Sequence, residues 1–535
     1  MIKLDDIRRY AAGRPEATAI ADGEERLTWE QFAQAVDQVA AGLTDRLPQE
    51  GTARSVFLAD NRWQLAVVMA ACATLGVSCT GLDPAAGPEE LTHTLTRLEP
   101  SLVFVTGEYR EVLDRCVWPA GPQALHVLLD ASDTQAAPGR SEDRRTLGFG
   151  ELLETEPLAR LPEPLSYESF TVVPGEDRPR IAVRRTPTEA RRLIDLVDEF
   201  GFDAADVHLL AAPLWQQTAQ DLTRTMLGLG ATVVLGRYTD PAALAETIPQ
   251  MRVTTAVIDP TALNELLAHP ASASIASSSH LRCVMALGRH LGRWTVNTAW
   301  ERLGPALHLA HATAQTGLNT IMTPEESLVV PMRSGRVTLG NTVAVLGEDG
   351  TPLSAGRAGR VAVAGHQVMD EYLDDEAPFV TLDLGQGEQR FFVTGDLGLM
   401  DEQGRLRLTG RTESVEIDAR DGAVDEALFR LESDLLNLPC LRDTAVMRVD
   451  HPKLGDALVV PFIAVAVDRE QTGYQALTAS CARRVPSLPA HVIAVDEIPY
   501  SPTGRIRAGE LLESVVPIIT LNLQLEQSMH QEMSA

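Results

Sequence analysis

The chain has 535 residues, of which 44% are hydrophobic, enough for about three or four domain-sized units of roughly 150 residues each. Its 74 acidic and 46 basic side chains give a net charge of −28. A surface this acidic repels phosphate backbones and anionic lipids, so the composition argues against a general nucleic-acid-binding or membrane-surface role.

The first 110 residues predict helices that alternate with strands. Thr28 followed by Gln31 is a capping-box pattern, which marks the start of a helix. The apolar residues that follow lie at helical spacing: Phe32, Val36, Val39 and Leu43. Further along we predict strands at 55–58, 77–80 and 102–106 and a helix over 63–75. This alternation favours βαβ units and a mostly parallel sheet.

The middle of the chain repeats this pattern after an interruption. Residues 131–165 are rich in Pro, Ser, Asp, Glu and Arg, which predicts a surface excursion that could hold a short helix at 147–153. Helices are then predicted at 187–200, 219–229 and 242–251, and strands at 207–212, 232–235 and 255–258. Repeated βα units of this kind fit two related subdomains.

The pattern changes after residue 325. Apolar residues alternate with small or polar ones over 335–346 and 356–365, which predicts antiparallel sheet or a distorted barrel. A turn at 401–404 predicts a hairpin. Beyond it, a helix at 425–436 and strands at 444–449 and 458–466 predict a small αβ unit, and the tail after Val516 is expected to be frayed or docked on the body.

The predicted fold class is therefore α/β. We expect a large N-terminal domain at 1–410, built from two βα subdomains plus a distorted β-barrel. A small α+β C-terminal domain is expected at 411–515 and a tail at 516–535.

Six scattered cysteines without CxxC spacing indicate neither a zinc site nor a disulfide framework. The chain starts without an apolar signal segment. Residues 65–82 approach the length of a membrane span, but the break near Gly76 favours a buried helix followed by a buried strand. We therefore expect a cytoplasmic protein without a membrane span.

Lysine is almost absent from this chain. Lys3 and Lys453 are the only two, and every other basic side chain is arginine. A reaction that needs a lysine therefore has two candidates. Arginine is a poor replacement, because its guanidinium is planar and stays protonated.

Short motifs occur in a recognisable order along nearly the whole chain. They are the segments 14–22, 27–29, 61–84, 212–215 (Ala-Pro-Leu-Trp), 356–372, 391–398 (Phe-Phe-Val-Thr-Gly-Asp-Leu-Gly), 410–411 and 498–505. In this order they resemble the adenylate-forming superfamily, which comprises acyl- and aryl-CoA ligases, stand-alone adenylation domains and luciferases. The resemblance implies a nucleotide site, an acyl pocket and a small C-terminal domain that rotates between two half-reactions.

The resemblance also implies a chemistry. A carboxylate attacks the α-phosphate of ATP, pyrophosphate leaves, and the acyl-AMP then forms a thioester. The implied cofactors and substrates are ATP or AMP, Mg²⁺ and CoA or phosphopantetheine. The implied partners are an acyl or aryl carboxylate or thioester and a carrier protein or pathway enzyme, with no nucleic acid among them.

Candidate site residues follow from the matching motifs. Nucleotide-binding candidates are Thr394, Asp396, Arg411 and His311; in the family the Asp holds the ribose hydroxyls and an aromatic residue stacks on the base. Acyl-pocket candidates are Trp215, Gly288 and Ala312. The alternatives from the residues themselves stay open: Asp396 could cap the turn at 394–395, Arg411 could pair with an acidic neighbour, and His311 could simply be packed.

Three positions depart from the family pattern. The phosphate loop matches residues 172–180, where the hydroxyl donors are missing and Glu176 and Asp177 would face phosphate as like charges. Gln315 stands at the position of the metal-binding Glu, and an amide is a poorer Mg²⁺ ligand than a carboxylate. Arg505 stands at the position of the catalytic Lys.

No metal site is predicted. His308 and His311 are three residues apart, but no third ligand is visible near them.

Three hypotheses follow. The first is a divergent member of the superfamily that is impaired in adenylation and retained for binding an acyl or aryl group, CoA, a carrier protein or a partner enzyme. The second is a working ligase whose phosphate site relies on Arg505, Arg180 and Arg178. The third is a non-enzymatic scaffold subunit.

Overall fold

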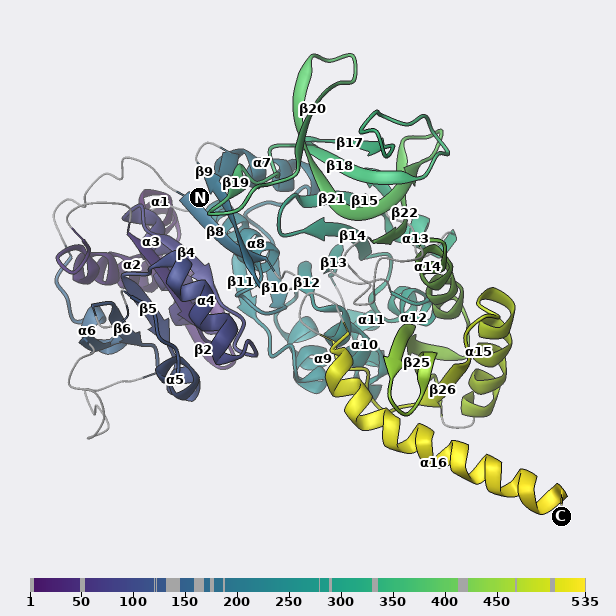
Figure 1. Cartoon of the computed structure of the whole chain (residues 1–535). Coiled ribbons are helices and arrows are strands. Elements are labelled where there is room, and N and C mark those ends of the chain that lie inside the picture. The colour runs from purple at the N-terminus through teal and green to yellow at the C-terminus, as the bar shows by residue number, and fades with distance from the viewer. Residues whose placement is uncertain are drawn as a thin grey trace.

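The computed structural model describes residues 4–48, 53–119, 121, 123–130, 145–157, 168–173, 178–185, 188–278, 280–287, 291–329, 335–411, 422–466, 469–500 and 506–534. It is a mixed α/β fold with a large N-terminal domain and a smaller C-terminal domain (Figure 1). The predicted boundary at 411 falls at the last described residue of β22, and 412–421 lie outside the described residues.

The N-terminal subdomain is built on a parallel sheet of five strands in the order β4-β3-β5-β6-β7. Its strands are β3 (Arg54–Leu58), β4 (Ser78–Gly81), β5 (Leu102–Val105), β6 (Leu125–Leu128) and β7 (Arg145–Gly148). The helices of this region are α2 (Trp29–Thr44), α3 (Trp63–Thr74), α4 (Pro88–Leu98), α5 (Gly107–Asp114) and α6 (Phe149–Leu153). The predicted alternation is confirmed here, as is the short helix near 147–153.

The capping box at the start of α2 is also confirmed. Gln31 N donates to Thr28 Oγ1 over 3.2 Å, and Thr28 N donates to Gln31 Oε1 over 2.9 Å. The two bonds satisfy backbone donors that the first turn of a helix leaves unpaired. The predicted apolar face is fully buried at all four of its positions: Phe32, Val36, Val39 and Leu43.

A second sheet of 14 strands contains the rest of the large domain. Its main path is β17-β18-β21-β22-β16-β15-β14-β13-β12-β10-β11-β1-β2, with β20 paired to β21. The half that ends in β1 and β2 is mostly parallel: β1 (Thr18–Asp22), β2 (Glu25–Thr28), β10 (Val207–Ala211), β11 (Thr232–Leu235), β12 (Thr255–Ile258), β13 (Cys283–Leu287) and β14 (Leu307–Thr313). Its helices are α1 (Leu4–Gly13), α7 (Thr188–Phe200), α8 (Gln217–Leu229), α9 (Pro241–Gln250), α10 (Pro260–Ala268), η1 (Pro270–Ser274), α11 (Ile275–Ser278), α12 (Arg293–Leu303) and α13 (Pro324–Val329).

The other half of this sheet is antiparallel and lies at the top of Figure 1. Its strands are β15 (Gly317–Met322), β16 (Gly335–Val337), β17 (Asn341–Leu346), β18 (Gly359–Gly365), β20 (Phe379–Asp383), β21 (Glu388–Met400) and β22 (Arg405–Arg411). The predicted hairpin around 401–404 joins β21 to β22. A separate three-stranded sheet has the order β19-β9-β8: β19 (Glu371–Tyr372), β9 (Arg180–Arg185) and β8 (Glu168–Val173).

The predicted barrel requires a correction. Within the described ranges the large sheet is an open path from β17 to β2, and no pairing closes it. The sheet nevertheless curls. In a flat sheet β21 and β14, four places apart in the path, would be separated by about 19 Å. His311 on β14 instead lies 3.0 Å from Asp396 on β21. Curling without closure explains why the sequence pattern resembled that of a barrel.

The C-terminal domain contains a four-stranded sheet in which β25 is paired with β23, β24 and β26. Its elements are α14 (Gly422–Leu436), β23 (Leu441–Thr444), β24 (Met447–His451), β25 (Gly455–Ala464), α15 (Glu470–Arg484), β26 (Ala490–Ala494) and α16 (Ala508–Ser534). The strand predicted at 444–449 is therefore wrong in its bounds, because two strands, β23 and β24, meet there.

The C-terminal tail is helical. The single helix α16 runs through the predicted start of the tail at 516 and extends away from the body (Figure 1). Leu511, Val515 and Ile519 recur every four residues and are buried against the C-terminal sheet. Beyond them, Leu521 and Leu525 are each 55% exposed.

Burial accounts for the long apolar stretch and for the cysteines. Residues 65–82 form the buried helix α3 and the buried strand β4, as predicted. In the part of the chain that the structure describes, no helix combines the length and apolar character needed to cross a membrane. All six cysteines are free thiols in the structure.

His208 on β10 makes stability depend on pH. Its ring is fully buried, with Nδ1 2.9 Å from Thr255 Oγ1, and burial lowers its pKa from 6.5 to about 4. As pH falls from about 6.5 to 4, the unfolded chain binds a proton that the folded chain does not, so stability falls in this window. We expect His208→Asn to lose less unfolding free energy than the wild type between pH 7.5 and 4.5, by up to about 3 kcal/mol. Urea unfolding at both pH values measures this, and identical pH dependence in the two proteins would refute it.

Candidate functional site

The side chains of His311 and Asp396 meet inside the curled part of the large sheet. His311 Nε2 and Asp396 Oδ2 are 3.0 Å apart, and their side chains are only 15% and 5% exposed. On the other side of the ring, Asn319 Nδ2 lies 3.4 Å from His311 Nδ1. Because a carboxylate only accepts and the Asn319 amide nitrogen only donates, this pattern assigns the ring proton to Nε2. His311 is therefore hydrogen-bonded on both sides and is not merely packed.

Thr394 shapes the backbone that presents Asp396. Its hydroxyl donates to Val361 O over 2.9 Å and accepts from Asp396 N over 3.1 Å. The side chain that holds this turn is therefore that of Thr394, while the Asp396 carboxylate faces His311. Arg411, the last residue of β22, pairs in register with Asp396 on β21. The structure thus brings together three of the four predicted nucleotide-binding residues: His311, Asp396 and Thr394. Arg411 lies next to Asp396 because their strands pair at these positions.

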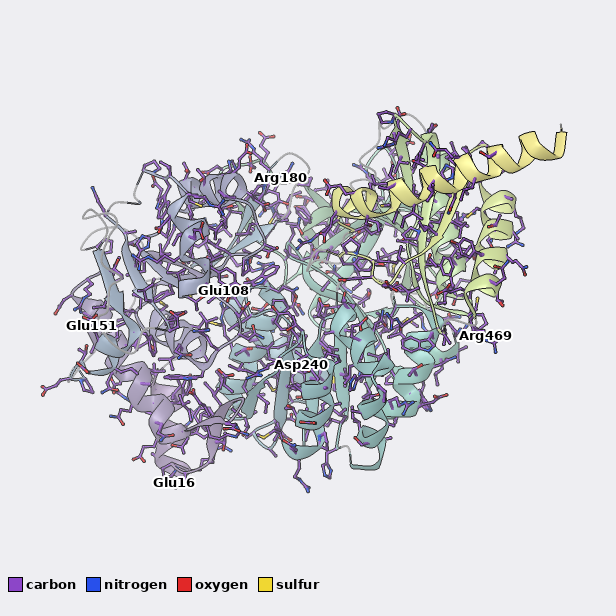
Figure 2. The ribbon with its side chains drawn as sticks, turned by 90° about the horizontal axis from the view of Figure 1, so that it is seen from below. Glu16, Glu108, Glu151, Arg180, Asp240 and Arg469 are labelled. Carbon is purple, nitrogen blue, oxygen red and sulfur yellow. The ribbon has the colours of Figure 1, made fainter. Side chains whose placement is uncertain are left out.

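A small pocket of about 30 Å³ lies beside this pair. Six of its lining residues are Arg180, Thr313, Gln315, Tyr372, Phe392 and Thr394. Gln315 Nε2 donates to Tyr372 Oη over 3.1 Å, and the Arg180 guanidinium lies over the Tyr372 ring, 5.4 Å from its centroid. Figure 2 labels Arg180 near the border between the N-terminal half of the molecule and the antiparallel strands. We call this cavity the Arg180 pocket.

A divalent metal does not fit the residues of the Arg180 pocket. Mg²⁺ prefers carboxylate oxygens, but the described lining holds no Asp or Glu, and Gln315 offers only an amide. Within the described ranges, no group of three or more His, Cys, Asp or Glu could hold a metal ion. His308 and His311 do not converge, because residues three apart on a strand point to opposite faces. The ring of His308 instead bonds to Ala306 O over 2.9 Å, and burial lowers its pKa.

Arg184 on β9 positions the turn that carries Gln315, and sequence reasoning missed it. It is fully buried and donates to the carbonyls of Ala314 and Gln367 and to Thr171 Oγ1. Because three acceptors from different segments converge on it, Arg184 fixes the turn against β8 and β9. The available signal was an arginine that directly follows the apolar residues in the middle of the strand Arg180–Arg185.

The predicted acyl-pocket residues border the main hydrophobic core. Trp215 and Ala312 are half-buried against the same large cluster of apolar side chains. Asn61 holds the Trp215 segment in place, because its amide donates to Ala212 O over 2.8 Å and accepts from Leu214 N over 2.7 Å. A Cβ on Gly81 would lie 2.4 Å from Trp215 Cα, so this segment touches β4 closely.

Several predicted residues lie outside the described residues. They are Gly288, Arg505 and the centre of the phosphate loop at 174–177. The ends of that loop are described: β8 ends at Val173, and β9 begins at Arg180. Arg180 is therefore the first strand residue after the loop.

Comparisons with known proteins agree with this architecture. The profile of the AMP-binding enzyme family matches residues 7–167 and 186–373. The indoleacetate–CoA ligase of Aromatoleum aromaticum is 26% identical over 521 residues, which is 95% of this chain and 97% of that protein. A feruloyl-CoA synthase of Amycolatopsis sp. is 24% identical over 510 residues, 94% of this chain and 97% of that protein.

A solved structure shows the same fold. The anthranilate CoA ligase AuaEII in complex with anthranoyl-AMP superposes with a TM-score of 0.76 at 17% identity, and the match covers 96% of each chain. The family profile includes the segment that holds His311, and the relatives and the superposition extend over nearly the whole chain. The chain belongs to the AMP-binding enzyme family of adenylate-forming proteins.

Proposed function

We propose that this chain is a divergent acyl- or aryl-CoA-ligase-like protein that binds an adenine nucleotide and an aromatic acyl ligand but is impaired in carboxylate adenylation. In this proposal Asp396 accepts from the ribose hydroxyls and His311 lies beside the base, with Thr394 and Arg411 next to them. Trp215, Gly288 and Ala312 border the acyl ligand. The second substrate is CoA or phosphopantetheine, free or on a carrier protein, and the ligand class follows the relatives, whose names specify indoleacetate, ferulate and anthranoyl-AMP.

One observation carries the proposal: a buried carboxylate lies beside a pocket whose described lining holds no carboxylate that could bind a metal. The Asp396 side chain is 5% exposed, which makes it a strong acceptor for hydroxyl donors. Gln315, by contrast, donates from its amide to Tyr372. Adenylation brings together two anions, and catalysis therefore depends on fixed positive charge around the phosphates. Binding of the nucleotide does not require this arrangement of positive charge, so the proposed protein still binds it.

The second candidate function is an active ligase with an arginine-based phosphate site. Arg180 favours it, because its guanidinium lines the same pocket as Gln315. In this version Arg180 and Arg505, at the position of the family's lysine, provide the positive charge for the departing pyrophosphate. The overall reaction is that proposed from the resemblance: carboxylate and ATP give acyl-AMP and pyrophosphate, and a thiol then gives the thioester and AMP.

Two measurements distinguish these candidates. Calorimetric titration with AMP and ATP measures binding, and a pyrophosphate-release assay with indoleacetate, ferulate or anthranilate plus CoA measures adenylation. We expect nucleotide binding with pyrophosphate release far below the ordinary enzyme rate of about 10 s⁻¹. Release near that rate would identify the active ligase. Failure to bind any nucleotide would overturn both candidates and leave the scaffold hypothesis.

A further inference from the structure

We propose that the Arg180 pocket binds the phosphate groups of a polyphosphate anion without a divalent cation, with the Arg180 guanidinium in place of the metal. This inference deepens the proposed function and rests on its nucleotide site. It follows from the charge, the donors and the rigidity of the described residues. Its ligand class is a di- or triphosphate, either free pyrophosphate or the phosphate end of a nucleotide.

The charges around the pocket favour an anion. Among the residues that the structure describes, its lining includes one arginine and no acidic side chain. Neighbouring arginines are neutralised: Arg97 bonds to Asp374 and Asp375, and Arg178 lies 3.8 Å from Asp375. Among the residues that the structure describes, Arg180 has no carboxylate within 4.0 Å. In a chain of net charge −28, the Arg180 guanidinium is thus not neutralised by a carboxylate of the described residues.

The donors of the pocket suit phosphate oxygens. Guanidinium groups bind phosphate in a bidentate, charge-assisted geometry. The Gln315 amide has two N–H donors, one of which is directed at Tyr372. The Thr313 hydroxyl lies 2.7 Å from Thr316 Oγ1, on the same turn. The amide N–H and the hydroxyl can donate to an anion, whereas their oxygens are neutral acceptors that attract Mg²⁺ less than a carboxylate does.

The same features disfavour a divalent metal. Replacement of a carboxylate by the Gln315 amide removes the negative charge that would attract Mg²⁺. A guanidinium in the same pocket repels the cation by Coulomb interaction, and solvent screens part of this repulsion because Arg180 is exposed. A metal ion and Arg180 are therefore alternative sources of positive charge for the phosphates, and in this chain the source is Arg180.

The walls of the pocket are held before any ligand arrives. Tyr372 is 4% exposed and packs edge-on against Phe392, with ring centroids 6.3 Å apart. Its ring supports the Arg180 guanidinium, and the buried Arg184 holds the turn that carries Gln315. A preorganised site loses less side-chain entropy on binding. The position of Arg180 over Tyr372 therefore favours a specific anion site.

Calorimetric titration with inorganic pyrophosphate, once with EDTA and once with Mg²⁺, tests the proposal in the full-length protein. We expect binding in EDTA that Mg²⁺ does not strengthen. Arg180→Gln is expected to weaken it about tenfold or more, because a charge-assisted hydrogen bond is lost. The matched control is Arg185→Gln, an exposed arginine at the other end of β9 that pairs with Glu168 and Glu371 and does not line the pocket, with affinity unchanged.

Gln315→Glu gives a reciprocal test. A carboxylate at this position should repel pyrophosphate in EDTA and restore binding when Mg²⁺ is added, so the variant gains the metal dependence that the wild type lacks. Strict Mg²⁺ dependence of the wild type, or equal losses in Arg185→Gln and Arg180→Gln, would overturn the inference.

AMP titration separates this inference from the proposed function. AMP has no pyrophosphate group, so Arg180→Gln should bind it as the wild type does. Retained AMP binding with Mg²⁺-dependent pyrophosphate binding refutes only the metal-free pocket. Pyrophosphate binding in EDTA without any AMP binding refutes only the nucleotide site of the proposed function.

Discussion

Asp396→Ala is expected to weaken AMP binding about 100-fold or more. Its carboxylate is buried, and a hydrogen bond to a charged group contributes about 1.5–3 kcal/mol, so the loss of two ribose hydroxyl contacts gives an effect of this size. Titration calorimetry with AMP measures it. The matched control is Glu402→Ala in the exposed turn between β21 and β22, where affinity should not change.

A conservative substitution separates ligand contact from folding. Asp396→Asn keeps the shape of the side chain and its bond from His311 Nε2 but removes the charge. We expect it to lose most of the AMP affinity while its thermal unfolding stays close to that of the wild type. Wild-type affinity in Asp396→Ala would show that the nucleotide, if bound, lies elsewhere, and the proposed ribose contact would be wrong.

Gly81→Ala is expected to destabilise the large domain by about 3 kcal/mol, at the upper end of ordinary overpacking effects. The new Cβ would lie 2.4 Å from Trp215 Cα and 2.7 Å from Trp215 O. Backbone atoms cannot relieve this clash by a change of rotamer, as a flexible side chain can. Asn61 also holds the adjacent segment at Ala212 and Leu214. The segment that carries Trp215 would therefore have to shift.

The control for this substitution is Gly87→Ala, a few residues further along the chain. Gly87 has φ −68°, and an alanine Cβ at this position would meet no other atom within 4 Å, so alanine should fit there without strain. Urea unfolding followed by tryptophan fluorescence compares both variants with the wild type. Equal midpoints for Gly81→Ala and Gly87→Ala would contradict the close contact between β4 and the Trp215 segment.

Elements whose signal is local could be predicted from the sequence. The strands at 232–235 and 255–258 match β11 and β12 at both ends, and α2 begins at its predicted cap. These signals are short-range, since a cap and a hydrophobic period involve residues within a turn or two. The helix α16 was missed because Pro517 and the polar end of the tail obscured the four-residue period of its buried side chains.

In the candidate site, too, single residues could be predicted from local motifs, whereas their contacts could not. The resemblance indicated His311 from one motif and Thr394 and Asp396 from another, at 391–398. Their contact depends on how strongly the sheet curls between β14 and β21, which pairings along the whole antiparallel half determine. Arg184 carried no motif, and Tyr372 ended the motif at 356–372 without a role assigned to it. Their roles follow from burial and from the carbonyls and rings that surround them.

The sequence by itself determined the fold family and most of the order of helices and strands, and it predicts Gln315 and Arg505 at the positions of the family's metal-binding Glu and catalytic Lys. Only the tertiary structure decided that the predicted barrel is an open, curled sheet and that His311 and Asp396, 85 residues apart, are hydrogen-bonded. It also placed Arg180 in the same pocket as Gln315. The reason is physical: helix and strand patterns are encoded over a few neighbouring residues, whereas a binding site depends on side chains that long-range packing brings together.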